Sequence, residues 1–265
     1  MAFEELKKRH AQVWGAAPFE KVAGTIHDMH DDLVAHLAPR PGEQWLDLAC
    51  GTGEVAFRAV RAGAVVSASD LAPALVDTAR QLAADEGLEL TLEVADCEDL
   101  PYEDASFDVV SSSVGIIFAP DHPQVASELG RVCRPGGRIG FTAWRGESGV
   151  GDIFRAMSPF APPPPEGAGS PFQWGDEAYV EQMLGDWFDL RFAEGNSQHV
   201  DEDAREMWEL FRDNYGPTFT LWSSLDEERR AELDTAMTEM FERSRVGDRI
   251  AQERLYVIAL GTRKA

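Results

Sequence analysis

Basic residues are scarce in this sequence of 265 residues, which has 24 Lys and Arg against 47 Asp and Glu and a formal net charge of −23. Nucleic acids are bound through a basic face that neutralises phosphates, and anionic lipid surfaces attract clusters of Lys and Arg. The charge therefore predicts that neither nucleic acid nor a membrane is a partner. It also points away from strongly anionic small molecules. The length and a hydrophobic content of 44% are typical of an ordinary globular protein with a substantial core.

Cysteine is also rare, because the chain has only Cys50, Cys97 and Cys133, which lie far apart. An odd number without a CxxC pair predicts neither a disulfide framework nor a zinc site, and we expect no metal. No run of about 18 apolar residues is present that would span a membrane. The first residues lack the apolar segment of a signal peptide, so the expected location is cytoplasmic.

Short apolar strands alternate with amphipathic helices over the first 145 residues. The patterns predict strands at 45–49, 65–69, 88–94, 107–113 and 138–143, and helices at 3–14, 19–38, 54–62, 73–85 and 125–132. Arg-Pro-Gly-Gly at 134–137 is typical of a turn before the last of these strands. Alternation at this spacing predicts a doubly wound α/β fold with a mostly parallel sheet.

The character of the chain changes near residue 146. Four consecutive prolines at 162–165 predict an extended connector, and helices are expected at 177–184, 203–215 and 226–245, with a strand at 187–192. The strongly apolar segment 254–261 predicts a strand buried on both faces. We therefore expect an N-terminal helical arm (1–38), a cofactor-binding core (39–145), a connector with a mainly helical cap (146–252), and a final strand that returns to the core sheet (253–265).

Polar residues and glycines follow three successive strands of the predicted sheet. Open α/β sheets bind ligands outside the carboxyl ends of their strands. Gly51 and Gly53 allow a tight turn after the first strand, the carboxylate of Asp70 after the second suits the two hydroxyls of a ribose, and Asp96 after the third can accept from the exocyclic amine of a base. The three strand ends suit an adenosine.

Alternatives remain open at these positions. A nicotinamide dinucleotide uses the same fold, but Asp47, four residues before Gly51, would repel a pyrophosphate and suits a cationic group such as an ammonium. Asp70 is also placed to cap the next helix, and Asp96 can be a simple turn residue. The acidic run at 98–104 is interpreted as a solvated loop.

In order and spacing, these motifs resemble the class I S-adenosylmethionine-dependent methyltransferases. The resembling segments lie at 46–53, 70, 96–97, 100–101, 106–110, 128–132 and 134–137. They are similar to the small-molecule branch that includes ubiquinone and menaquinone biosynthesis methyltransferases, over about residues 40–145. The resemblance implies S-adenosyl-L-methionine as cofactor, a Rossmann-like sheet of seven strands with an antiparallel last strand, and methyl transfer to a small molecule.

The resemblance implies that the first and fourth strand ends hold the methionine part of the cofactor. Asp47 and Gly51 would lie at this end, and the carbonyl of Ala49 would face the ammonium. Gly53 would allow the turn, and Ser113 would lie beside the methyl group.

The second and third strand ends would hold the adenosine part. By the same resemblance, Asp70 would bind the ribose hydroxyls and Leu71 would pack on the adenine. Asp96 would accept from the adenine amine, and Cys97 would supply a backbone contact.

Methyl transfer from a sulfonium does not require a base, because correct placement of the two reactants supplies much of the rate. A phenol or alcohol acceptor would still benefit from one. The weak candidates are His27, His30, His199 and Tyr215, and the simpler interpretation of His27 and His30 is that they are surface residues. His122 is expected to be structural.

Aromatic side chains are concentrated in the arm and the cap. They are Trp14, Phe19, Phe118, Trp144, Phe172, Trp174, Trp208, Phe211, Tyr215, Phe219 and Trp222. Apolar aromatic walls predict a flat or lipophilic acceptor, although the same residues can simply form the core of the cap. Two alternative functions remain: a nicotinamide-dependent oxidoreductase, and a sulfonium-binding protein of this fold that transfers no methyl group.

Overall fold

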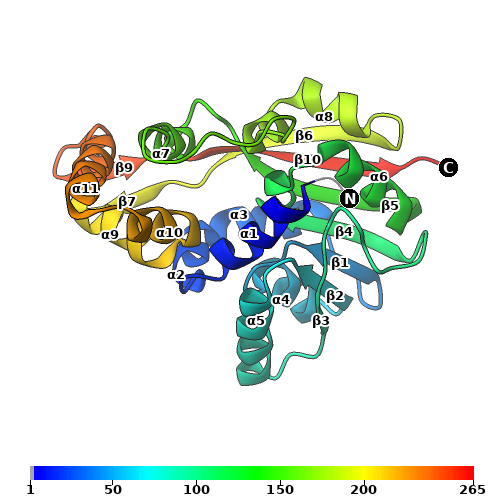
Figure 1. Cartoon of the computed structure of the whole chain (residues 1–265). Helices are drawn as coiled ribbons and strands as arrows, with labels where there is room; N and C mark the ends of the chain where they lie inside the picture. The colour runs from blue at the N-terminus through cyan, green and yellow to red at the C-terminus, as the bar shows by residue number, and fades with distance from the viewer. Residues whose placement is uncertain (1–2) are drawn as a thin grey trace.

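A seven-stranded β-sheet lies at the centre of the structure, a computed structural model that describes residues 3–265 (Figure 1). In sheet order the strands are β3 (Thr91–Val94), β2 (Val65–Asp70), β1 (Gln44–Leu48), β4 (Phe107–Ser113), β5 (Cys133–Trp144), β10 (Leu255–Arg263) and β6 (Phe188–Asn196). β10 is antiparallel to β5 and β6, and the other pairs are parallel. The predicted seven-stranded, mostly parallel sheet with an antiparallel last strand is confirmed.

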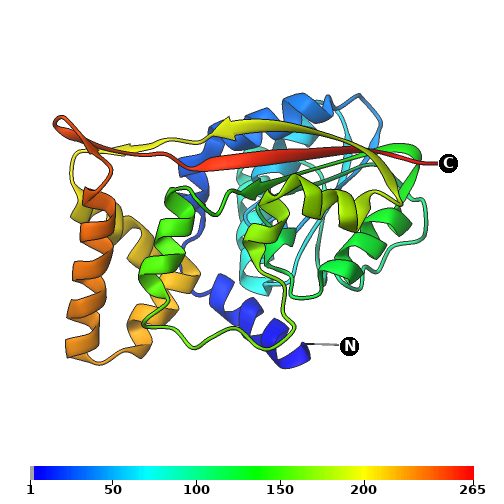
Figure 2. The same cartoon turned by 90° about the horizontal axis from the view of Figure 1, so that it is seen from above.

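Helices cover both faces of this sheet. The helices packed on it or beside it are α3 (His27–Leu37), α4 (Glu54–Arg61), α5 (Pro73–Glu86), α6 (His122–Val132) and α8 (Glu177–Leu184). Figure 2 shows α3 on one side of the sheet, and α6 and α8 together on the other. Leu46, Leu48 and Val109 are fully buried between these layers, as expected for the central strands of a parallel sheet.

The prediction of a turn at 134–137 is wrong, because these residues are part of the strand β5. The register between β4 and β5 shifts between Phe107 and Val109, and Gly136 has a φ of 76°. Pro and Gly mark a bulge as well as a turn, since both interrupt regular strand pairing. The strand therefore continues through the interruption.

The N-terminal arm is divided more finely than its sequence pattern predicts. α1 (Glu4–Trp14) matches the first predicted helix, whereas the second is split into α2 (Glu20–Ala23), the 3-10 turn η1 (Gly24–Ile26) and α3. Val22 of α2 packs into the core of the cap, and Ile26 packs into the core of the sheet. The arm therefore joins the two parts.

The cap contains α7 (Gly149–Met157), α9 (Ala204–Asn214), α10 (Gly216–Ser224) and α11 (Glu227–Glu242). A small sheet of β7 (His199–Asp201), β9 (Arg249–Gln252) and β8 (Arg245–Val246) closes it. Its own core is formed by apolar residues of α9 and α11: Met207, Trp208, Phe211, Leu233, Met237 and Phe241. The helices α7 and α10 and the small sheet were not predicted.

The range 146–252 includes core elements as well as the cap. Residues 162–165 form no helix or strand, as expected for a connector, and the short turn η3 (Pro171–Gly175) leads to α8 and then to β6 at the edge of the sheet. A second short turn, η2 (Ile116–Phe118), follows β4. No helix within residues 3–265 has both the length and the apolar character to cross a membrane.

Candidate functional site

A pocket lies at the carboxyl ends of β1 to β4, between the sheet, the arm and the cap. It is lined by residues from all three parts, including the strand-end residues Asp47, Ala49, Gly51, Asp70, Leu71, Asp96, Cys97 and Ser113. Of the nine residues predicted to hold the cofactor, eight therefore line one pocket. The ninth, Gly53, shapes the turn below it.

The turn after β1 is made by residues in the left-handed region of backbone conformation. Ala49, Gly51 and Gly53 have φ values of 48°, 55° and 97°. A side chain at Gly53 would place its Cβ 2.5 Å from the ring of Phe57, so only glycine fits there. The turn leads directly into α4, whose first N–H groups are directed toward the strand ends.

Asp47 is a carboxylate buried beneath this turn, with 1% of its surface exposed. Its Oδ1 accepts from Ser111 Oγ at 2.7 Å, and its Oδ2 accepts from the backbone N–H of Ala56 at 3.1 Å. Burial raises the pKa of Asp47 to about 7, because these two hydrogen bonds do not fully replace water around the charge. A cation in the pocket would stabilise the ionised form.

Asp70 connects the end of β2 to the turn after β1. Its two carboxylate oxygens accept from the backbone N–H groups of Gly51 at 2.9 Å and Ala72 at 2.8 Å. Burial raises the pKa of this carboxyl. Asp70 does not cap α5 from the N-cap position, which Ala72 occupies. Each oxygen keeps a lone pair that can accept from a hydroxyl in the pocket.

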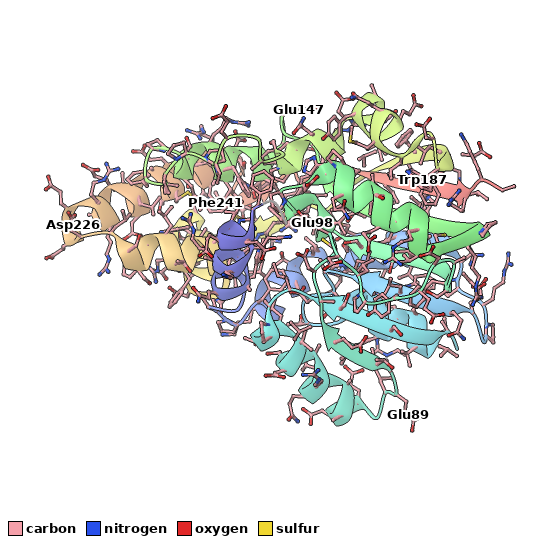
Figure 3. The ribbon with its side chains drawn as sticks, turned by 45° about the vertical axis from the view of Figure 1, so that its right-hand side comes forward. Glu89, Glu98, Glu147, Trp187, Asp226 and Phe241 are labelled. Atoms are coloured by element: carbon pink, nitrogen blue, oxygen red, sulfur yellow. The ribbon has the colours of Figure 1, made fainter. Side chains whose placement is uncertain are left out.

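Asp96 is held by a cation that the sequence did not reveal. Lys7 of α1 lies 2.6 Å from Asp96 Oδ2 and donates to Glu98 Oε2 at 2.8 Å, and only 4% of Lys7 is exposed. Burial lowers the pKa of Lys7, but the two carboxylates outweigh this effect and hold the pKa above its ordinary value. Figure 3 shows Glu98 beside α1, where the arm meets the sheet. The ion pairs hold α1 over the pocket.

The interpretation of residues 98–104 as a solvated loop is wrong for Glu98, which is 2% exposed. Its other oxygen, Oε1, accepts from the backbone N–H of Asp121 at 2.8 Å. Cys97 beside it is a small wall residue. Burial raises the pKa of the Cys97 thiol, which keeps it protonated and unreactive.

Ser113 and His30 meet at the end of β4. His30 Nδ1 lies 3.0 Å from Ser113 Oγ, which lies 3.2 Å from Thr142 Oγ1. Burial lowers the pKa of His30 to about 4, so the imidazole is neutral at physiological pH. Its Nε2 is buried and has no hydrogen-bond partner within the described chain. His30 also lines the pocket.

The structure separates the four candidate bases into two pairs. His30 and Tyr215 line the pocket, whereas His27 and His199 do not. His27 is exposed on the outer side of the arm, 3.5 Å from Glu54. His199 lies on β7 in the cap, and burial lowers its pKa to about 4.

Four aromatic rings form one wall of the pocket. The ring centroid of Trp14 lies 5.8 Å from that of Phe19, 4.8 Å from that of Phe118 and 5.3 Å from that of Tyr215. These rings come from the arm, from η2 and from the start of α10, and all four line the pocket. By contrast, Trp208 is part of the core of the cap. The aromatic residues therefore divide into a subset that lines the pocket and a subset that forms the core of the cap.

Two basic residues of the site were missed by sequence reasoning. Lys7 is one of several charged residues on an exposed-looking helix, and Arg254 stands at the start of the apolar final segment. Both are buried and both line the pocket. The charge before an apolar strand was the one available signal for Arg254, and nothing local distinguished Lys7 from Lys8.

The chain is similar in sequence to several known proteins. The methyltransferase domain family matches residues 46–141. An uncharacterized protein of Mycobacterium tuberculosis, Rv1405c, is 34% identical over 242 residues, which cover 89% of this chain and 88% of that protein. The ubiquinone/menaquinone biosynthesis C-methyltransferase UbiE of Brucella anthropi is 42% identical over 124 residues, or 44% of this chain and 47% of that protein.

The fold is also similar to solved structures. The crystal structure of a putative methyltransferase from Bacillus halodurans aligns with a TM-score of 0.64 and 18% identity, over 89% of this chain and 99% of that one. The domain match spans β1 to β5 and contains the strand ends that form the pocket. The chain belongs to the class I S-adenosylmethionine-dependent methyltransferases, and S-adenosylmethionine is its cofactor.

Proposed function

We propose that this enzyme methylates a small aromatic or lipophilic acceptor, which binds between the sheet edge and the aromatic wall of Trp14, Phe19, Phe118 and Tyr215. The wall is the observation that carries the proposal. It presents flat apolar surfaces to the same pocket that contains the cofactor residues. Apolar walls with few polar groups suit a ligand of this kind.

The strand-end residues fit the cofactor on chemical grounds. When bound, S-adenosylmethionine supplies a methyl group on a positively charged sulfur. Asp47 is buried and forms no ion pair within residues 3–265, and burial raises its pKa, so it suits the ammonium beside the Ala49 carbonyl. Gly51 allows close approach of the backbone, and Gly53 shapes the turn beneath it.

We propose that the adenosine part lies over the ends of β2 and β3. The free lone pairs of Asp70 would accept from the ribose hydroxyls, and Leu71 would contact the adenine. Asp96 would accept from the adenine amine with Cys97 beside it, although Asp96 also binds Lys7. The arm (1–38), core (39–145), cap (146–252) and final strand (253–265) remain the proposed division, except that α8 and β6 join the core sheet.

His30 and Ser113 would orient an acceptor hydroxyl near the methyl group. A neutral His30 can accept a hydrogen bond from the Ser113 hydroxyl at Nδ1. A lone pair of Ser113 Oγ would then remain to accept a hydrogen bond from the acceptor hydroxyl. Tyr215 would offer its hydroxyl to the pocket that it lines. No role in the reaction is proposed for His27 or His199, because neither lines the pocket.

Transfer of a radiolabelled methyl group to a panel of hydrophobic phenols and quinols, compared with amino acids and small amines, tests the proposal. We expect labelled products from the aromatic compounds. Trp14→Ala should lower kcat/KM for them at least about tenfold, because a large buried contact surface is lost. Phe219→Ala is the control, since Phe219 is an exposed ring on α10. Labelling of the amines alone would contradict the proposal.

A further inference from the structure

Arg254 is not among the residues proposed to hold the cofactor, yet it is a buried residue of the same pocket. It connects β9 to β10, is 2% exposed and lines the pocket together with Trp144, Val150 and Ile153. A buried arginine is uncommon, because its charge must be compensated inside the protein. The groups around Arg254 therefore show how far its charge is compensated.

Every acceptor that Arg254 contacts is neutral. Its Nε donates to Ser197 O at 2.7 Å, and its Nη1 donates to Thr25 Oγ1 at 2.9 Å. Its Nη2 donates to Thr25 O and to Ser197 Oγ, the latter at 3.3 Å. A guanidinium has five N–H groups, so one N–H on Nη1 has no acceptor among residues 3–265. These contacts also hold the side chain in one position.

No carboxylate oxygen within residues 3–265 lies within 4.0 Å of a guanidinium nitrogen of Arg254, which is the limit for an ion pair. The nearest carboxylate in its hydrogen-bond network is the exposed Asp28, which accepts from Ser197 Oγ at 2.6 Å. By comparison, Arg138 and Arg145 are less buried, and each makes direct ion pairs. Burial lowers the pKa of Arg254 to about 10, so it remains charged at neutral pH. A cation fixed in this way is ready to receive an anion.

An anion bound by Arg254 would lie away from the residues proposed to hold the cofactor. The antiparallel strand β10 begins at the edge where the parallel strands end, because Tyr256 pairs with Trp144. β10 lies three strand intervals from β1, or roughly 14 Å across the sheet. The cofactor residues extend from β4 in the opposite direction, through β1 and β2 to β3. Arg254 therefore lies on the acceptor side of the pocket.

We propose that Arg254 binds a carboxylate of the methyl acceptor and thereby selects aromatic or lipophilic monocarboxylic acids. This inference rests on the proposed function, since the aromatic wall would hold the apolar part of the same molecule. A guanidinium matches a carboxylate in geometry and charge. One cation compensates one negative charge, which agrees with a protein whose net charge of −23 disfavours strongly anionic ligands.

The experiment compares two compounds that share a ring system and differ in charge. 1-Naphthoate and 1-naphthamide are titrated by calorimetry into the full chain saturated with S-adenosylhomocysteine. The wild type should bind the naphthoate at least about tenfold more tightly. Arg254→Gln should bring the two affinities to within about threefold of each other. Arg263→Gln is the control, because Arg263 stacks on Trp187 outside the pocket and should keep the wild-type preference.

Each other outcome has a defined meaning. Equal affinities in the wild type, or a preference that Arg254→Gln leaves unchanged, would overturn the role of Arg254 but not the aromatic acceptor. If neither compound binds, the proposed function fails and this inference fails with it. If Arg254→Gln weakens S-adenosylhomocysteine but not 5′-methylthioadenosine, which lacks the carboxylate, Arg254 binds the cofactor and the acceptor role is wrong.

Arg254 also connects Thr25 to Ser197, so Arg254→Gln needs a thermal melt to show that it folds. Should it fail to fold, Arg254→Lys decides. Lysine keeps the charge but not the planar set of donors. A preference for naphthoate that falls by about threefold or more would support the proposal, and an unchanged preference would overturn it.

Discussion

Two regions of the pocket hold their functional side chains in different ways. One is the edge of the sheet at which the parallel strands end, and the other is the cover that the arm and the cap form over this edge. At the edge, Asp47 lies within β1 and Asp70 ends β2. Backbone N–H groups hold both carboxylates, from α4 for Asp47 and from the turns after β1 and β2 for Asp70. In the cover, Lys7 and Arg254 are fixed by side-chain contacts with residues far away in the sequence. The edge is therefore determined by the fold itself, whereas the cover depends on individual side chains that can change without loss of the sheet.

This difference assigns separate tasks to the two regions. The same edge can bind one cofactor throughout a family, while in the function proposed above the cover selects the acceptor. Changes at the edge should then alter cofactor binding most, and changes in the cover should alter stability of the arm or the choice of acceptor.

The largest effect is expected at the edge, from Asp70→Ala. This change removes the acceptor for the Gly51 and Ala72 N–H groups and the proposed partner of the ribose hydroxyls. Hydrogen bonds to a charged group contribute about 1.5–3 kcal/mol each, so affinity for S-adenosylhomocysteine should fall at least about 100-fold by calorimetry. Asp70→Asn should lose less affinity for S-adenosylhomocysteine than Asp70→Ala. Unchanged affinity in Asp70→Ala would show that the ribose assignment is wrong.

A change in the cover, Lys7→Met, should destabilise the protein. It leaves Asp96 and the buried Glu98 without their cation, and breaking a buried ion pair in this way costs about 3 kcal/mol. The loss should appear in urea unfolding and as faster hydrogen exchange in α1. Lys8→Met is the matched control, because Lys8 makes an exposed pair with Glu5. Equal effects of the two substitutions would mean that α1 is held by its apolar contacts alone.

The edge was predictable from the sequence because its positions are local. A strand followed by Gly-x-Gly, or by Asp, places those residues at the same edge once the strands are parallel. The contacts of the cover are not local: Lys7 reaches Glu98 across 91 positions and Arg254 reaches Thr25 across 229. No periodicity encodes such pairs. The helix α10 was missed for a different reason, because its residues lack an amphipathic pattern and only Pro217 marks its first turn.

An effect of intermediate size is expected from the protonation of Asp47. Its pKa of about 7 in the free protein lies above its value in an unfolded chain, near 3.9. The native state therefore binds the proton more tightly, so the contribution of Asp47 to stability is present at low pH and decreases as pH rises from about 4 to about 7. The ammonium of a bound cofactor should lower the pKa of Asp47 again, because it favours the ionised carboxylate.

Binding of S-adenosylhomocysteine below pH 7 should therefore release a proton, and affinity should rise several-fold between about pH 5.5 and 7.5. Calorimetry in two buffers of different ionisation enthalpy counts the protons released. Asp47→Asn should abolish the release and flatten the profile. A wild type that releases no proton would place the ammonium elsewhere in the pocket.

The smallest effect is expected from His30→Gln, where edge and cover meet. With a pKa of about 4, His30 is neutral from about pH 5.5 upward and is a weak base, so its main contribution is the hydrogen bond to Ser113. Glutamine can supply the same acceptor. Methyl transfer to a phenol should then fall less than about tenfold in kcat, with the shape of the pH profile unchanged, whereas His30→Ala should lose more. A loss in His30→Gln that exceeds about 100-fold, with a new dependence on pH, would instead make His30 a true base and place the reaction's proton transfer in the arm rather than at the sheet edge.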